Sequence, residues 1–176
     1  MSTSSPTPSL SPSSAPSLWH DRAAAWLAES RIDGRAWIGG QRVDTLDGQT
    51  FECHSPIDGR RLCAVARGQA ADIDRAVASA RQAFDDRRWA GKAPAVRKRI
   101  LLRWAELITQ HKDELALLET LDMGKPIQYS LSVDVPAAAR CIAWYAEAID
   151  KVYDEIAPTP STALALIQRE PVGVVG

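Results

Sequence analysis

Cysteine and histidine are the residues of this chain whose chemistry is most versatile, and three of them lie within eleven positions. Cys53, His54 and Cys63 are the types that bind metals or act as nucleophile and base. Zinc sites use pairs spaced as C-x₂₋₄-C or H-x₃₋₅-H, and this spacing matches neither. Adjacent strand residues point to opposite faces, so we expect Cys53 and His54 not to meet. The cluster therefore predicts neither a zinc site nor a self-contained nucleophile.

Charge, cysteine content and glycine pattern argue against several further classes of partner and binding site. The chain has 176 residues with 21 Lys+Arg against 22 Asp+Glu, a formal charge of −1 that gives no electrostatic case for a nucleic-acid or membrane partner. Three cysteines suit a reducing cytosol, and apolar runs are too short to span a bilayer. Gly173 and Gly176 form no G-x-G-x-x-G loop, and no G-x-x-x-x-G-K-[ST] motif is present. We therefore expect a cytoplasmic globular protein with no nucleotide loop of its own.

The elements that must position any site follow from composition and periodicity. Residues 1–18 hold eight Ser and four Pro, which predicts a disordered tail, and a short amphipathic helix is expected over 19–29. A period of two with glycine and proline turns predicts short antiparallel strands between Trp37 and Ala66. Helical periodicity follows after Gly68, with one helix starting at Pro94, possible N-capping at Asp113, and another helix over 134–152.

The end of the sequence differs in character from the helical part. Gly124 followed by Pro126 predicts a helix end with Gly124 in the left-handed conformation. Residues 163–168 read as a strand, and Val172 to Gly176 read as the start of a buried strand with no turn or polar tail behind it. A natural domain seldom finishes inside a core strand, so we expect the front portion of a longer protein.

Five segments of the chain follow one another in an order and at intervals typical of one enzyme family. They are Trp37-Ile38-Gly39-Gly40, Ser55-Pro56-Ile57-Asp58-Gly59, Leu117-Leu118-Glu119-Thr120-Leu121-Asp122-Met123-Gly124-Lys125-Pro126, Trp144-Tyr145-Ala146 and Arg169-Glu170-Pro171-Val172-Gly173-Val174-Val175-Gly176. Taken in this order, they resemble the N-terminal portion of the NAD(P)-dependent aldehyde dehydrogenase superfamily, and the resemblance covers about residues 19–176. Within that superfamily, residues 116–156 are most similar to the gamma-glutamyl-gamma-aminobutyraldehyde dehydrogenases of putrescine degradation.

The resemblance implies a mixed α/β fold: N-terminal β-ribbons, three or four helices and an assembly strand, as an incomplete front part of the family fold. It implies that residues 19–152 belong to the cofactor-binding domain and that residues 153–171 mediate assembly of a homo-oligomer. Residues 172–176 would begin a core strand. The family's catalytic cysteine, glutamate base and oxyanion asparagine have no counterpart in this chain, so the resemblance implies no catalytic and no cofactor-binding residue here.

Two groups of site residues carry over from the resemblance. Asp122, with main-chain oxygens at Cys53 and His54, matches positions that hold a structural monovalent cation. Asp134 and Ala137 match positions near the mouth of the substrate tunnel, where an acidic group would meet the cationic end of an amino aldehyde. Ser55 replaces the usual asparagine beside Pro56, a departure from the family's cation-site pattern.

Two functions are compatible with the sequence. The first is the N-terminal part of an enzyme that oxidises an omega-amino aldehyde to the carboxylate with NAD or NADP, with the chain inactive and free of cofactor on its own. The second is a non-catalytic assembly module that pairs with a full-length homologue or a separate C-terminal chain. The DNA just past the Gly176 codon would separate these two functions. A continuing frame that encodes Pro-Trp-Asn-Phe favours the first, and a stop codon with an independent promoter favours the second.

Overall fold

The computed structural model describes residues 15–29 and 32–176, and the chain divides into two units, 1–32 and 33–176. The first unit contains α1 (Ala15–Ala28), in which Ala23 and Trp26 are buried, as the predicted apolar stripe requires. The helix begins four residues before the expected position, because backbone hydrogen bonds rather than apolar periodicity set a helix end. Disorder over 15–18 is therefore not observed, and the remainder of the expected tail lies outside the described residues.

Two antiparallel ribbons open the second unit, where the period-two pattern predicts them. β1 (Ala36–Ile38) pairs with β2 (Gln41–Val43) through Gly39 and Gly40, whose φ angles of 62° and 80° fit a two-residue turn with both central residues left-handed. β3 (Thr50–His54) pairs with β4 (Arg61–Ala66) around the Ser55–Gly59 turn. A register shift lies between Cys53 and His54.

α2 (Ala70–Asp85) is fastened to the ribbon region by a buried carboxylate. Asp72 accepts hydrogen bonds from the main-chain N–H groups of Gln69 at 3.1 Å and Leu46 at 3.0 Å. These donors lower the pKa of Asp72, with Gln69 the larger cause. One side chain therefore caps the helix and holds the loop that follows β2.

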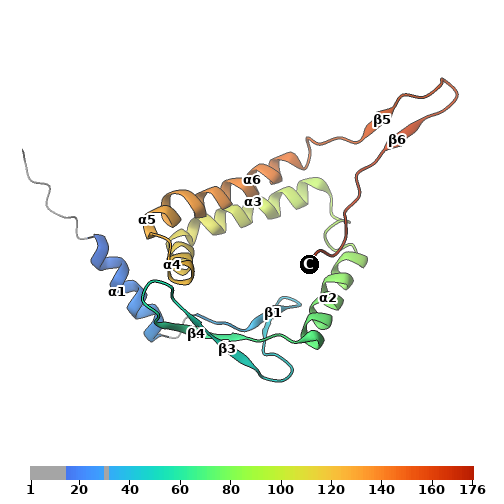
Figure 1. Ribbon diagram of the computed structural model, residues 1–176. Helices are drawn as coiled ribbons and strands as arrows, with labels where there is room; N and C mark the ends of the chain where they lie inside the picture. Colours follow the sequence, from blue (N-terminus) through green and yellow to red (C-terminus); the bar gives the residue numbers. More distant parts are fainter. Residues whose placement is uncertain (1–14, 30–31) are drawn as a thin grey trace, which may run out of the picture. The chain divides into compact units, whose positions relative to one another are not determined.

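Three further helices of the second unit pack against one another. α3 (Pro94–Gln110) and α6 (Val135–Ala148) lie side by side (Figure 1), and α4 (Lys112–Met123) packs against α3 and α6. Small buried residues, Ala105 on α3 and Ala139 on α6, allow the close approach. Expected N-capping by Asp113 is wrong, because His111 holds the N-cap position and Asp113 lies in the first turn.

The segment before α6 differs from the single helix predicted over 134–152. A short α5 (Ile127–Tyr129) leads into a π-helical turn, η1 (Ser130–Asp134), and α6 then ends at Ala148. Pro136 has no N–H to donate to the carbonyl four residues earlier, and the wider turn accommodates that loss. Ser130 is fully buried within this turn, with its hydroxyl 3.5 Å from that of Thr120.

The C-terminal segment is a hairpin followed by an extended tail. β5 (Glu155–Ala157) pairs with β6 (Ala165–Ile167), so that the mixed α/β class is confirmed with three two-stranded antiparallel sheets among the described residues. Residues 172–176 form no strand within the described part of the chain, and Val172 is 95% exposed. That these residues begin a core strand stays a prediction. A strand needs a neighbour for its N–H and C=O groups, and the described part of this chain pairs none with these residues.

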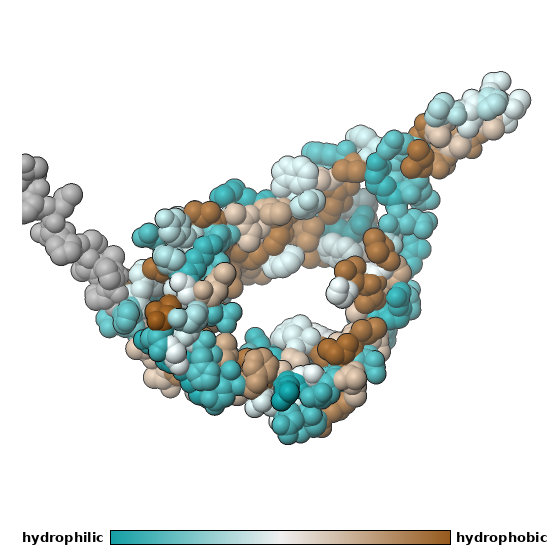
Figure 2. Space-filling view, viewed as in Figure 1, coloured by the Kyte–Doolittle hydropathy of each residue, from teal (hydrophilic) through white to brown (hydrophobic). Residues whose placement is uncertain are grey.

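The apolar faces predicted for the helices are only partly covered. Ile73 on α2 and Ile100 and Trp104 on α3 remain exposed, as do Trp144 and Tyr145 on α6. Figure 2 shows hydrophobic side chains at the surface along the α3 and α6 helices. Helical periodicity does not determine what covers these side chains.

Candidate functional site

The turn between β3 and β4 lies against the C-terminal end of α4. Gly124 ends that helix with φ 75° and ψ 12°, as predicted, and its N–H donates to the Thr120 carbonyl. A Cβ at Gly124 would lie 3.0 Å from Cγ of Pro56. The glycine therefore permits both the helix end and the close approach of the turn.

This approach brings together two residues of the expected cation site. The Cys53 thiol donates to Oδ1 of Asp122 across 3.4 Å. Burial, followed by this hydrogen bond, raises the pKa of Cys53, and burial is also the main cause that raises the pKa of Cys63. A raised pKa lowers the fraction of each thiol that is present as the nucleophilic thiolate at neutral pH. That neither cysteine is catalytic stays a prediction.

His54 turns away from this contact, as the strand alternation predicts. Its Nε2 lies 3.4 Å from a carboxylate oxygen of Glu52 on the same strand. No group of three or more His, Cys, Asp or Glu side chains able to hold a metal forms within 15–29 and 32–176. The role of Asp122 with main-chain oxygens of Cys53 and His54 as cation ligands stays a prediction.

The second expected pair, Asp134 and Ala137, lies where η1 passes into α6. The Asp134 carboxylate forms an ion pair with Nζ of Lys125, and a carboxylate oxygen of Glu119 lies 3.9 Å from the same nitrogen. Contact with Asp134 is the main cause that raises the pKa of Lys125. Ala137 follows in the first turn of α6 and is half-buried. The sequence pattern pairs Lys125 with neither Asp134 nor Glu119, so these two contacts are seen only in the structure.

A groove of about 580 Å³ runs between α3 and α6. Its apolar lining includes Leu102 and Ala105 from α3 and Val135, Ala139 and Ala143 from α6. Neither Asp134 nor Ala137 lines it. The groove and the expected tunnel residues are therefore different features of the same helix pair.

The described residues do not fit a nicotinamide cofactor on their own. Dinucleotides bind at the carboxyl ends of parallel strands, beside a glycine-rich turn that opens a helix. The three ladders here are antiparallel, and Gly34 with Val65 makes an isolated parallel bridge outside the named strands. No helix in the described part of the chain is long and apolar enough to cross a membrane.

Comparison with known proteins gives one consistent family. Residues 43–176 match the model of the aldehyde dehydrogenase family. The chain is 48% identical over 157 residues to the NADP/NAD-dependent aldehyde dehydrogenase PuuC of Escherichia coli, covering 89% of this chain and 31% of that protein. It is 46% identical over 159 residues to the aminoacetaldehyde dehydrogenase of Pseudomonas aeruginosa, covering 90% and 32%.

A solved structure agrees with these relatives. The crystal structure of gamma-glutamyl-gamma-aminobutyraldehyde dehydrogenase from Burkholderia cenocepacia is similar with a TM-score of 0.83 and 52% identity, covering 89% of this chain and 31% of that one. The chain thus spans about a third of the length of the relatives it matches. The family model matches most of the sequence, and this chain therefore belongs to the aldehyde dehydrogenase family.

Proposed function

We propose that this chain supplies the N-terminal third of an NAD(P)-dependent dehydrogenase that oxidises an omega-amino aldehyde to its carboxylate. The observation that carries the proposal is the acidic cluster at the start of α6, formed by Glu119, Lys125 and Asp134. Two of the relatives act, by their names, on aldehydes that carry an amine-derived group.

The charge of this cluster suits a cationic substrate end. One ammonium, that of Lys125, stands against two carboxylates, so the cluster keeps a net charge of about −1. Asp134 is about one-third exposed, which leaves the carboxylate accessible to a second cation. The small side chain of Ala137, one turn further along α6, leaves room beside it for the carbon chain of a substrate.

Two further roles belong to the same proposal. Asp122 and the main-chain oxygens of Cys53 and His54 are hard oxygen donors of the kind that bind a monovalent cation, and the Asp122 carboxylate is exposed. Such a cation would brace the β3–β4 turn against α4 rather than take part in the reaction. The residues that bind the nicotinamide cofactor and the residues that catalyse the reaction would come from sequence outside these 176 residues.

A chimera tests the substrate class. Residues 1–176 are joined to the remaining sequence of the Escherichia coli relative, and oxidation of 3-aminopropanal is compared with that of butanal, which has a similar size and no charge. Asp134→Asn should raise KM for the amino aldehyde about fivefold, corresponding to roughly 1 kcal/mol for a partly exposed charge pair, and leave butanal unchanged.

Glu106→Gln serves as the matched control, because Glu106 is an exposed acid that lines the α3–α6 groove away from the cluster. Equal changes for both aldehydes in the Asp134 variant would contradict the charge assignment. The purified chain alone should oxidise neither aldehyde with either nicotinamide cofactor. Turnover that survives replacement of all three cysteines would refute the assignment as a part of an enzyme.

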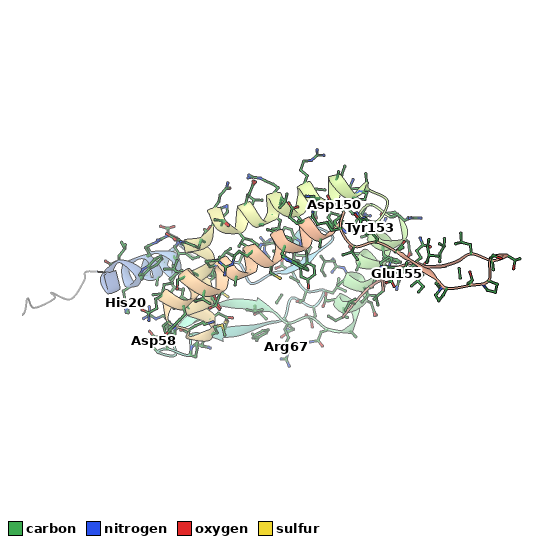
Figure 3. All side chains as sticks on the ribbon, turned by 90° about the horizontal axis from the view of Figure 1, so that it is seen from above. His20, Asp58, Arg67, Asp150, Tyr153 and Glu155 are labelled. Atoms are coloured by element: carbon green, nitrogen blue, oxygen red, sulfur yellow. The ribbon has the colours of Figure 1, made fainter. Side chains whose placement is uncertain are left out.

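The β5–β6 hairpin favours a second candidate function, assembly with another chain. Ile156 and Leu166 face each other across the ladder and are 70% and 67% exposed. Figure 3 labels Tyr153 and Glu155 where the hairpin begins, and Arg169 holds that end by donating to Glu155 at 2.7 Å. An isolated hairpin is marginally stable in water, so we infer that residues 153–171 pair with a second copy or a homologue.

Sedimentation at micromolar concentration tests this assembly role. The wild-type chain should self-associate, and Leu166→Asp should weaken the association, whereas Thr162→Asp at the exposed polar tip should not. A compact wild-type monomer, or equal behaviour of the two variants, would exclude the hairpin as the contact.

A further inference from the structure

Two of the three cysteines face each other across the β3–β4 ladder. Cys53 and Cys63 are register partners, so their side chains lie on the same face of the ribbon. Both are free and half-buried, whereas Cys141 on α6 is exposed. The six residues 55–60 that join the strands therefore place two thiols ten positions apart in direct opposition.

The ladder geometry permits a bond between them. The Arg67 N–H donates to the Gln49 carbonyl at 2.9 Å, and antiparallel pairs alternate between hydrogen-bonded and non-hydrogen-bonded types. Every second pair along the ladder is of the same type. From Gln49 with Arg67, the next such pairs are Phe51 with Val65 and then Cys53 with Cys63, so the two cysteines form a hydrogen-bonded pair. Such pairs have Cα atoms about 5.5 Å apart, which lies within the disulfide range of roughly 4.4 to 6.8 Å.

We propose that Cys53 and Cys63 form a thiol–disulfide exchange site that is oxidised by small disulfides of the glutathione class. One protein thiol, as the thiolate, attacks the glutathione disulfide, which gives a protein–glutathione mixed disulfide and one glutathione. The opposite thiol then attacks the protein sulfur and releases the second glutathione. Two S–H bonds are replaced by one protein S–S bond, and the two electrons and two protons leave on two glutathione thiols.

Oxidation would also remove a contact between the ribbon and α4. The Cys53 thiol donates to Asp122 in the reduced chain, and a disulfide sulfur has no proton to donate. The site therefore links the redox state of the ribbon to the turn that packs against the end of α4. This consequence does not depend on the proposed catalytic function.

Mass spectrometry after native oxidation tests the proposal. The chain carrying Cys141→Ser, which prevents links through that residue, is equilibrated with reduced and oxidised glutathione, and free thiols are then alkylated in denaturant. Trypsin cuts after Arg42, Arg60, Arg61 and Arg67, so the two cysteines lie in separate peptides, 43–60 and 62–67. We expect these peptides to be joined, two hydrogens lighter than their sum, with no glutathione attached.

The wild-type chain provides the control for the oxidant, because exposed Cys141 has no cysteine opposite and should carry glutathione. Native geometry should make the equilibrium constant for linking Cys53 to Cys63 on the order of 10- to 100-fold larger than in urea. Cys63→Ser should leave Cys53 with glutathione or as a free thiol. Separate glutathione on both cysteines, free thiols at both while Cys141 has reacted, or an equal constant in urea would each overturn the proposal.

Discussion

Replacing Gly124 by alanine should destabilise the chain through two additive costs. The backbone at φ 75° is left-handed, and a Cβ there costs about 1–2 kcal/mol. The new Cβ would also stand 3.0 Å from Cγ of Pro56, so the turn must shift, at a further cost of about 1 kcal/mol. The expected loss is therefore about 2–3 kcal/mol. With a urea slope near 2 kcal/mol per molar, the unfolding midpoint falls by about 1–1.5 M.

Gly59→Ala is the matched control, because Gly59 has φ 72° but nothing within 4 Å of a Cβ. This variant should incur only the backbone cost, which lowers the urea unfolding midpoint by about 0.5–1 M. Gly124→Asn should lie between wild type and Gly124→Ala, because asparagine tolerates this backbone but keeps the contact with Pro56. Gly124→Val should have the lowest unfolding midpoint of the series, because a β-branched residue fits the left-handed region poorly.

Urea unfolding followed by circular dichroism measures these midpoints, with the chimera as host if the chain self-associates. Equal midpoints for Gly124→Ala and Gly59→Ala would refute the contact with Pro56. An unchanged midpoint for Gly124→Val would refute the left-handed helix end and, with it, the placement of Asp122 beside the β3–β4 turn.

Two further predictions concern carboxylates. Asp72→Ala should lower the urea midpoint by about 0.5–1 M, since it removes the acceptor of two main-chain N–H groups, whereas exposed Asp74→Ala should leave it unchanged; equal effects of the two variants would contradict the capping role. The Arg35 guanidinium lowers the pKa of Asp33 to about 2, so the stabilisation from this pair is present above pH 4 and is lost as the pH falls toward 2. Arg35→Gln should move the Asp33 titration, followed by carbon NMR, back toward its ordinary value, and an unmoved titration would exclude the pair as the cause.

The sequence predicts the ribbons well because their signals are local. Strand alternation and glycine turns place short antiparallel strands between Trp37 and Ala66, where β1 to β4 are found, and Gly124 marks the end of α4. The π-helical turn was missed because its cause is a conflict between Pro136 and helix hydrogen bonding that apolar periodicity does not register. The strand expected over 172–176 stays a prediction, because an apolar run forms a ladder only beside a neighbouring strand and the described residues provide none.

In the candidate site, too, local sequence signals were predictable and contacts between distant segments were not. The resemblance pointed to Cys53 with Asp122, and the structure brings those side chains together. The pairing of Lys125 with Asp134 could not be predicted, because it depends on how η1 folds back toward the end of α4. The opposition of Cys53 and Cys63 depends on ladder register, which a turn and a bulge decide jointly.

The π-helical turn also determines which side of α6 faces α3. Val135 donates to the Ser130 carbonyl five residues earlier, so η1 holds one residue more than an α-helical turn would. Removing one residue there would restore an α-helical turn and rotate α6 by about 100° relative to α5. Ala139 and Ala146 would then no longer face α3, and the ion pair between Lys98 and Glu147 would be broken. Single-residue deletions over 130–134 should therefore be far more damaging than substitutions at exposed Ser132 and Val133.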